Sequence, residues 1–144
     1  MPKLNAARSA QYPLAAEFTF SVGDTMTNAA GALDNFSTVG IHVFDVIPLP
    51  PGATVIGGSI TTDVAVTGGT FNVSLGDAVS DVRYLAATNR TAAGTSPALT
   101  PGYIGAGDNV RLTANVSVGA ATTGKFTVRV LYTVLNRSQE NQIA

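Results

Sequence analysis

The feature that most constrains this chain is an alternation of apolar and polar residues with a period of two. It recurs in short segments that Gly, Pro, Asn and Asp separate. One such segment carries Phe18, Phe20 and Val22 at its apolar positions. Side chains alternate between the two faces of a β-strand, so this period predicts strands with one apolar face. No segment shows a helical period, and we therefore predict an all-β chain.

The strands expected in the first half follow from this alternation. Val39, Ile41 and Val43 predict a strand that ends at the prolines of residues 48–51. A long segment follows over residues 53–66, in which Gly57-Gly58 predicts a bulge or bend. Its apolar face is expected to carry Ile60, Thr62, Val64 and Val66.

Glycines and prolines divide the second half. Gly68-Gly69 predicts a tight hairpin between the long strand and a strand containing Phe71, Val73 and Leu75. Residues 80–86 predict another strand, and residues 87–108 predict a long loop. Residues 110–118 and 126–134 alternate on either side of a turn at 119–124 and predict two long antiparallel strands.

Seven or eight strands, each with one apolar face, bury those faces best as two packed sheets. We therefore expect a single antiparallel β-sandwich with a jelly-roll-like topology. The sandwich is predicted to span residues 15–136, with an N-terminal arm over 1–14 and a C-terminal tail over 137–144 that lack the strand pattern. A chain of 144 residues is the usual size of one domain.

The composition points to a surface that partners cover. Charged residues make up 12% of the chain, against about 25% in an average globular protein. The net charge is −1, and the eight cationic residues are scattered, which argues against nucleic acid as a partner. No cysteine is present, in keeping with a cytosolic origin, and no apolar run predicts a signal peptide or a membrane span.

Candidate catalytic residues are sparse. His42 is the sole histidine, and Asp45 is placed on the opposite face of its strand, so no catalytic triad can be drawn and His42 is expected to be an outward or interface residue. Asp24, Asp34, Asp77 and Asp108 occupy turn-like positions, where aspartate commonly bonds its own backbone. We therefore predict no catalytic residue.

Binding motifs are equally sparse. The segment LGDAVSD, with Asp77 and Asp81, is interpreted as turn chemistry rather than a calcium site, and no zinc-protease, P-loop or dinucleotide motif occurs. We predict no cofactor, metal or small-molecule substrate. Asn72 and Asn115 belong to N-x-S/T triplets within strands and are interpreted as outward polar positions. A carbohydrate-binding module would rely on exposed aromatic residues, for which Tyr84 and Tyr103 are the weak candidates.

Several motifs resemble those of small virion proteins of tailed bacteriophages. They are the P-G-A-x-V-x-G element at 51–57, V-x-L-G-D at 73–77, R-Y-L at 83–85 and a final G-x-x-x-V-x-V-x-Y strand at 124–132. The resemblance covers roughly residues 48–136. It implies a structural virion protein, made in the cytoplasm of the bacterial host, and carries over no catalytic residue.

Within that group, the chain is most similar to capsid decoration, or cement, proteins. The resemblance implies a location on the capsid surface, with the major capsid protein and copies of the chain itself, as a trimer, for partners. An arm over residues 2–12 would bind a neighbouring subunit, and the expected contact residues are Lys3, Leu4, Arg8, Tyr12 and, in the tail, Ile143. The alternatives are a tail, neck or fibre-associated virion component, a carbohydrate-binding module or an enzyme.

Overall fold

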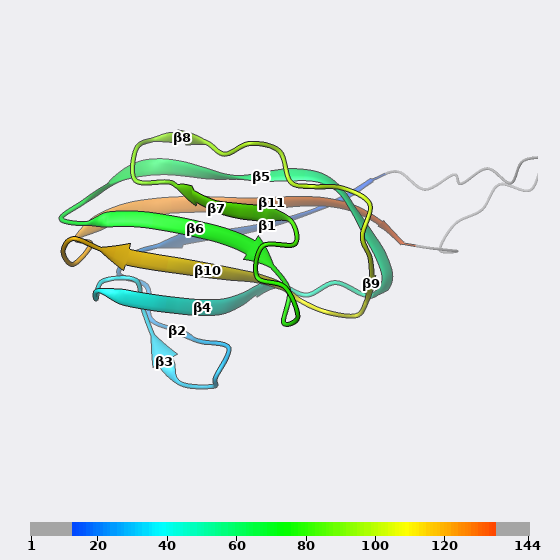
Figure 1. The fold of residues 1–144 in the computed structure, drawn as a ribbon, viewed down its shortest axis with the longest axis horizontal. Helices are drawn as coiled ribbons and strands as arrows, with labels where there is room; N and C mark the ends of the chain where they lie inside the picture. Colours follow the sequence, from blue (N-terminus) through cyan, green and yellow to red (C-terminus); the bar gives the residue numbers. More distant parts are fainter. Residues whose placement is uncertain (1–12, 135–144) are drawn as a thin grey trace, which may run out of the picture.

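The computed structural model describes residues 13–134, which form an all-β sandwich of two sheets packed face to face (Figure 1). Within that range the backbone contains no helix, and hence none that could cross a membrane. The prediction of an all-β sandwich is confirmed.

The first sheet is built on the four strands β1, β11, β5 and β8, in that spatial order. A short strand, β9, also pairs with β5. Every pairing in the sheet is antiparallel. The bounds are β1 Leu14–Ser21, β5 Pro51–Thr67, β8 Gly94–Thr95, β9 Ile104–Ala106 and β11 Thr123–Val134.

The second sheet is built on β4, β10, β6 and β7, in that spatial order and again antiparallel. A small separate pair, β2 with β3, lies beside β4 in Figure 1. The bounds are β2 Met26–Thr27, β3 Leu33–Asp34, β4 Gly40–Ile47, β6 Thr70–Gly76, β7 Leu85–Asn89 and β10 Val110–Ser117.

The order of the strands is that of a jelly roll. Of the eight main strands, β1, β5, β8 and β11 form one sheet and β4, β6, β7 and β10 form the other. Most strands that follow each other in the sequence therefore lie in opposite sheets; β6 and β7 are the pair that remains together. This double-sheet arrangement of eight strands is the jelly-roll solution to burying two apolar sheet faces.

Two links that the sequence analysis interprets as turns within a sheet are corners between the sheets. The predicted hairpin at Gly68-Gly69 is wrong, because β5 and β6 belong to different sheets. The strands on either side of residues 119–124, β10 and β11, are likewise not hydrogen-bonded to each other. The two corners pack together, with the Thr122 amide donating to the Thr67 carbonyl at 2.8 Å.

The close approach of the corners explains their glycines. A Cβ added to Gly69 would overlap the carbonyl oxygen of Gly119, and one added to Gly119 would overlap that of Gly68. These glycines therefore let the two backbone segments touch at the corners where the chain passes from one sheet to the other. At the predicted bulge, Gly58 lets β5 approach the backbone of β11 closely. Its φ is 128°, and the β5–β11 register shifts beside Gly57.

Two predicted segments differ in the structure. Residues 81–84 form turns, and the strand expected at 80–86 begins at Leu85 and continues to Asn89. The expected loop at 87–108 also contains β8 and β9. These short edge strands escape prediction because two or three residues are too few to establish a period of two.

The core lies between the sheets and centres on phenylalanines. Phe71 of the second sheet stacks on Phe126 of the first, with ring centroids 4.4 Å apart, and Phe126 stacks in turn on Phe20 at 5.2 Å. Phe36, from the link between β3 and β4, enters between the sheets and contacts Phe20, Phe44 and Phe71. Each of these rings is at most 2% exposed, so the apolar alternation does mark the core.

The face of β4 is the reverse of its prediction, and one residue of the predicted β5 face, Val64, turns outward. In β4 the buried residues are His42, Phe44 and Val46, whereas Ile41 is 67% exposed. Alternation alone cannot choose between two faces that both carry apolar residues. In β5 the register shifts at Asp63, which turns Val64 outward while Ile60, Thr62 and Val66 remain buried.

Candidate interaction surfaces

The predicted contact residues Lys3, Leu4, Arg8, Tyr12 and Ile143 lie outside the described residues. The structure does place the ends of the sandwich to which their segments are joined. Leu14 pairs with Tyr132, so the first residue of β1 and the end of β11 lie side by side (Figure 1). Residues 1–12 and 135–144 are therefore attached to the same end of the first sheet.

His42 is a buried structural residue, which corrects the outward position expected for it. Its Nδ1 lies 2.9 Å from an Asp34 carboxylate oxygen and its Nε2 lies 2.8 Å from the Thr38 carbonyl oxygen. Both ring nitrogens therefore lie within hydrogen-bond distance of acceptor oxygens. Since neither nitrogen is left for a substrate, the geometry gives His42 the role of tying the β2–β3 pair to β4.

Asp77 organises the turn after β6, as the sequence analysis predicts. One of its carboxylate oxygens accepts hydrogen bonds from the Val79 and Ser80 amides at 2.9 and 2.8 Å, and the other accepts one from Arg83. The Arg83 guanidinium also lies 3.7 Å above the ring of Tyr103. Asp81, the second candidate calcium ligand, takes no part in these bonds.

These carboxylates are held in their charged form. Burial acts to raise the pKa of Asp77, but the Ser80 and Val79 amides and Arg83 outweigh it, and the pKa lies below its usual 3.8. The pKa of Asp34 is lowered in the same way, because His42 and the Asn35 amide outweigh the burial. Both groups stabilise turns rather than presenting a proton to a substrate.

The aromatic candidates for carbohydrate binding are largely engaged within the chain. Tyr84 is 3% exposed, and one face of the Tyr103 ring is covered by Arg83. Among residues 13–134, no cluster of three or more His, Cys, Asp or Glu side chains could hold a metal ion.

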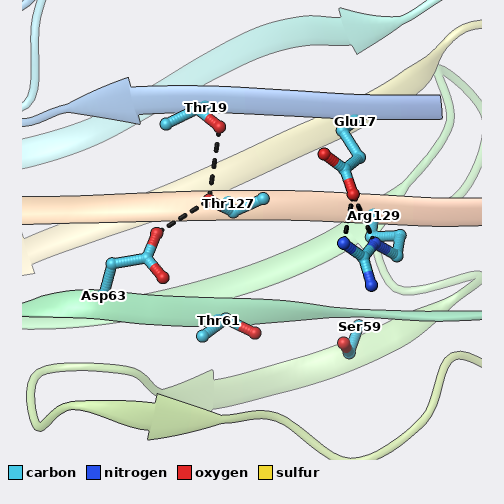
Figure 2. A pocket seen from close by; sticks show the side chains of 7 residues that line it. All are labelled: Glu17, Thr19, Ser59, Thr61, Asp63, Thr127 and Arg129. Atoms are coloured by element: carbon cyan, nitrogen blue, oxygen red, sulfur yellow. Dashed lines mark hydrogen bonds and ion pairs between the residues drawn. The ribbon is translucent and has the colours of Figure 1, made fainter.

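The outer face of the first sheet is rich in hydroxyl groups. Figure 2 shows Thr19 and Thr127 on neighbouring strands, with the Thr127 hydroxyl donating to Asp63 at 2.7 Å. Two residues further along the same two strands, Arg129 pairs with Glu17, and the Arg129 Nε lies 2.6 Å from the Glu17 carboxylate. These side chains, with Ser59 and Thr61, line a shallow hollow whose polar groups largely bond one another.

The outer face of the second sheet has a different character. It carries a hollow, here called the outer groove, that crosses β4, β10, β6 and β7 and is bordered by the turn after β6. The groove is lined by Ile41, Asn72, Val73, Ser74, Asp81, Val82, Ala87, Thr113 and Asn115. Asn115 is exposed and Asn72 half-buried, as predicted for outward positions. Ile41 is also shared with a second hollow that reaches Asn28–Ala30, so apolar surface continues towards the β2–β3 pair.

Comparison with known proteins gives matches by structure alone. No family model and no curated protein matches the sequence. The fold is similar to a chain in the solved cyanophage Pam1 capsid asymmetric unit, with a TM-score of 0.57 and 26% identity over 92% of this chain and 98% of that one.

Two further capsid structures share the fold at 18% identity. One is the acid-stable capsid of Helicobacter pylori bacteriophage KHP30, with a TM-score of 0.58 over 95% of this chain and 98% of that one. The other is the capsid of Ralstonia phage GP4, with a TM-score of 0.52 over 95% and 91%. In all three cases the match covers more than nine-tenths of both chains.

Proposed function

We propose that this chain is a structural protein of a tailed-phage virion, and specifically a decoration protein that binds the outer surface of the capsid shell and stabilises it. The observation that carries the proposal is the match to the chain from the Pam1 capsid over 92% and 98% of the two lengths. It agrees with the motifs at 51–57, 73–77, 83–85 and 124–132, which belong to the same jelly roll.

The physical character of the molecule supports a role in assembly. His42 and the carboxylates of Asp34 and Asp77 are engaged in holding turns. The two outer faces are broad and shallow rather than deeply hollowed. A protein of this kind contributes contact area instead of turnover. Many shallow contacts, repeated over a shell, sum to a strong restraint because each bound copy is held by several neighbours.

The arm over residues 2–12 is proposed as the main contact with the major capsid protein. It contains Lys3 and Arg8 and no acidic residue, and it also offers Leu4 and Tyr12 for burial. It is attached where β1 begins, at the edge of the first sheet. Backbone pairing with a strand edge of the capsid subunit would supply the affinity, and the two cations would select an acidic surface.

Deletion of residues 1–12 tests this proposal. The truncated chain keeps every described strand, so it should fold with an unchanged far-ultraviolet spectrum and melt as one transition, yet it should no longer sediment with purified shells. The control is Lys125→Ala, which removes an exposed cation from the sandwich and should leave retention intact. Retention of the truncated chain would reject the arm as the contact, and failure of the full chain to bind shells would reject decoration itself.

A further inference from the structure

The corner after β10 carries an exposed and strained valine. Val118 has a φ of 72°, in the left-handed region that β-branched residues avoid, and its side chain is 92% exposed. Glycine or asparagine would adopt this backbone at lower cost. Packing within the copy does not compensate the strain, because so little of the side chain is covered. A strained backbone that presents an apolar side chain to solvent is typical of a residue that contacts another protein surface.

The outer groove is a receptor of suitable chemistry. Ile41 and Val82 are 67% and 47% exposed. With Ala87 they form apolar walls on the two sides of the Asn72–Asn115 pair, because Ile41 of β4 lies next to Asn115 and β7 lies beyond Asn72. Val118 is fixed at the corner with its side chain in solvent, so it does not fill the groove of its own copy.

The charges around these two features are complementary. Arg90 lies at the same end of the second sheet as the corner, on the far side of β6 from β10: its amide bonds the Phe71 carbonyl, and Phe71 pairs with Val116, two residues before Val118. Asp81 lines the groove. Neither side chain belongs to the ion pairs found within residues 13–134. A cation at the same end of the sheet as the apolar tip and an anion beside an apolar wall of the groove would orient one copy on another.

We propose that Val118 of one copy inserts into the outer groove of a second copy, with Arg90 of the first beside Asp81 of the second. The two patches differ, so the contact is head to tail, and such contacts close into rings when the rotation between copies allows it. The inference refines the proposed decoration role by naming how copies contact each other. It concerns self-association, which can be measured without shells.

Disulfide trapping tests the contact directly, because the chain has no cysteine of its own. Copies carrying Val118→Cys are mixed in concentrated solution with differently tagged copies carrying Val82→Cys and then oxidised. The matched control replaces the second variant by Val64→Cys, which lies on the outer face of the first sheet and is 49% exposed against 47% for Val82. Disulfides form only where the two backbones come within several ångströms.

The proposal predicts several-fold more mixed disulfide from the 118 and 82 pair than from the 118 and 64 pair. Equal yields from the two pairs would overturn it. Shell binding of the same proteins is scored separately by sedimentation, so a mixed disulfide without shell binding rejects decoration and leaves the contact standing. Shell binding with equal disulfide yields from the two pairs rejects the contact between copies and leaves decoration standing.

A second variant separates contact from folding. Val118→Asn relieves the backbone strain and should raise the Tm by a few degrees, yet it removes the apolar tip and should weaken the concentration-dependent self-association seen in sedimentation velocity. Val118→Thr keeps the β-branch and should leave the Tm within a degree of the wild-type value. Unchanged self-association of Val118→Asn, or a wild-type chain that stays monomeric at high concentration, would contradict the proposal.

Discussion

At the scale of single residues, charged side chains hold turns that the apolar core does not reach. Asp34 ties the β2–β3 pair to His42 on β4, and Asp77 ties the turn after β6 to Arg83. The sequence predicts the second arrangement in part, since an aspartate after a strand commonly bonds nearby amides. It does not predict the first, because Asp34 and His42 meet only once the chain between them folds back over the sandwich.

Replacing Asp77 tests how much one such residue contributes. The side chain is fully buried, and Asp77→Asn would lose the ion pair with Arg83 and leave a poorer acceptor for the Val79 and Ser80 amides. We expect a loss of about 2–4 kcal/mol in the free energy of unfolding. Urea denaturation measures it, with the loop variant Asp108→Asn expected to change the value by less than about 0.5 kcal/mol. A loss at position 77 no larger than at 108 would contradict this account.

The same two carboxylates set the acid limit of stability. Their pKa values in the folded chain lie below the usual 3.8, so they stabilise the fold fully at pH values above the unfolded pKa. As the pH falls below about 4, the unfolded chain takes up protons first, and this stability is lost as the pH passes through the lowered folded pKa values. The Asp34→Asn, Asp77→Asn double variant should therefore show a flatter decline in Tm between pH 5 and pH 2, the pH range over which these shifts act. An unchanged slope would show that other groups set the acid limit.

At the scale of elements, the sequence predicts strands better than it predicts their partners. The alternations that include Phe20, Phe71 and Phe126 locate β1, β6 and β11 and their buried faces. A pair of glycines, however, serves equally as a hairpin turn and as a corner where the chain changes sheets. At Gly68-Gly69 it is a corner, because the strands on either side bury their apolar faces against each other across the core.

Glycine substitution tests the contact between the corners. Gly69→Ala would place a Cβ against the Gly119 carbonyl, and we expect a loss of about 1–3 kcal/mol in stability from the displacement that follows. Gly23→Ala is a matched control, since its Cβ would meet no atom within 4 Å. Thermal denaturation of both variants should show a clear fall in Tm for the first and little change for the second. Similar Tm values would mean that the corners do not touch in solution.

The face of β4 illustrates why a surface is harder to predict than a core. Ile41 and Val43 alternate as plausibly as Phe44 and Val46, and alternation gives no reason to choose between the two sets. Packing in the core decides the face, because Phe36 from the preceding link packs against Phe44 and holds that side inward. Ile41 thereby faces outward and becomes part of an apolar wall of the groove, which the sequence alone does not reveal.

At the scale of the whole molecule, the two outer faces differ in a way that suits a layered assembly. The first sheet presents hydroxyls and paired charges that largely bond one another, and the second presents apolar groups around an unpaired carboxylate. Both terminal segments are attached at one end, and the strained Val118 lies at the other, beyond the end of β10. The proposed contacts with shell and with neighbouring copies therefore use different parts of the molecule and can be made at once.

The central claim is that the chain decorates a capsid, and cryo-electron microscopy of purified particles tests it most directly. The account predicts density for the sandwich on the outer surface of the shell, repeated with the icosahedral symmetry, with residues 1–12 in contact with the major capsid protein. Density confined to the tail or neck, or no density on particles at all, would contradict it.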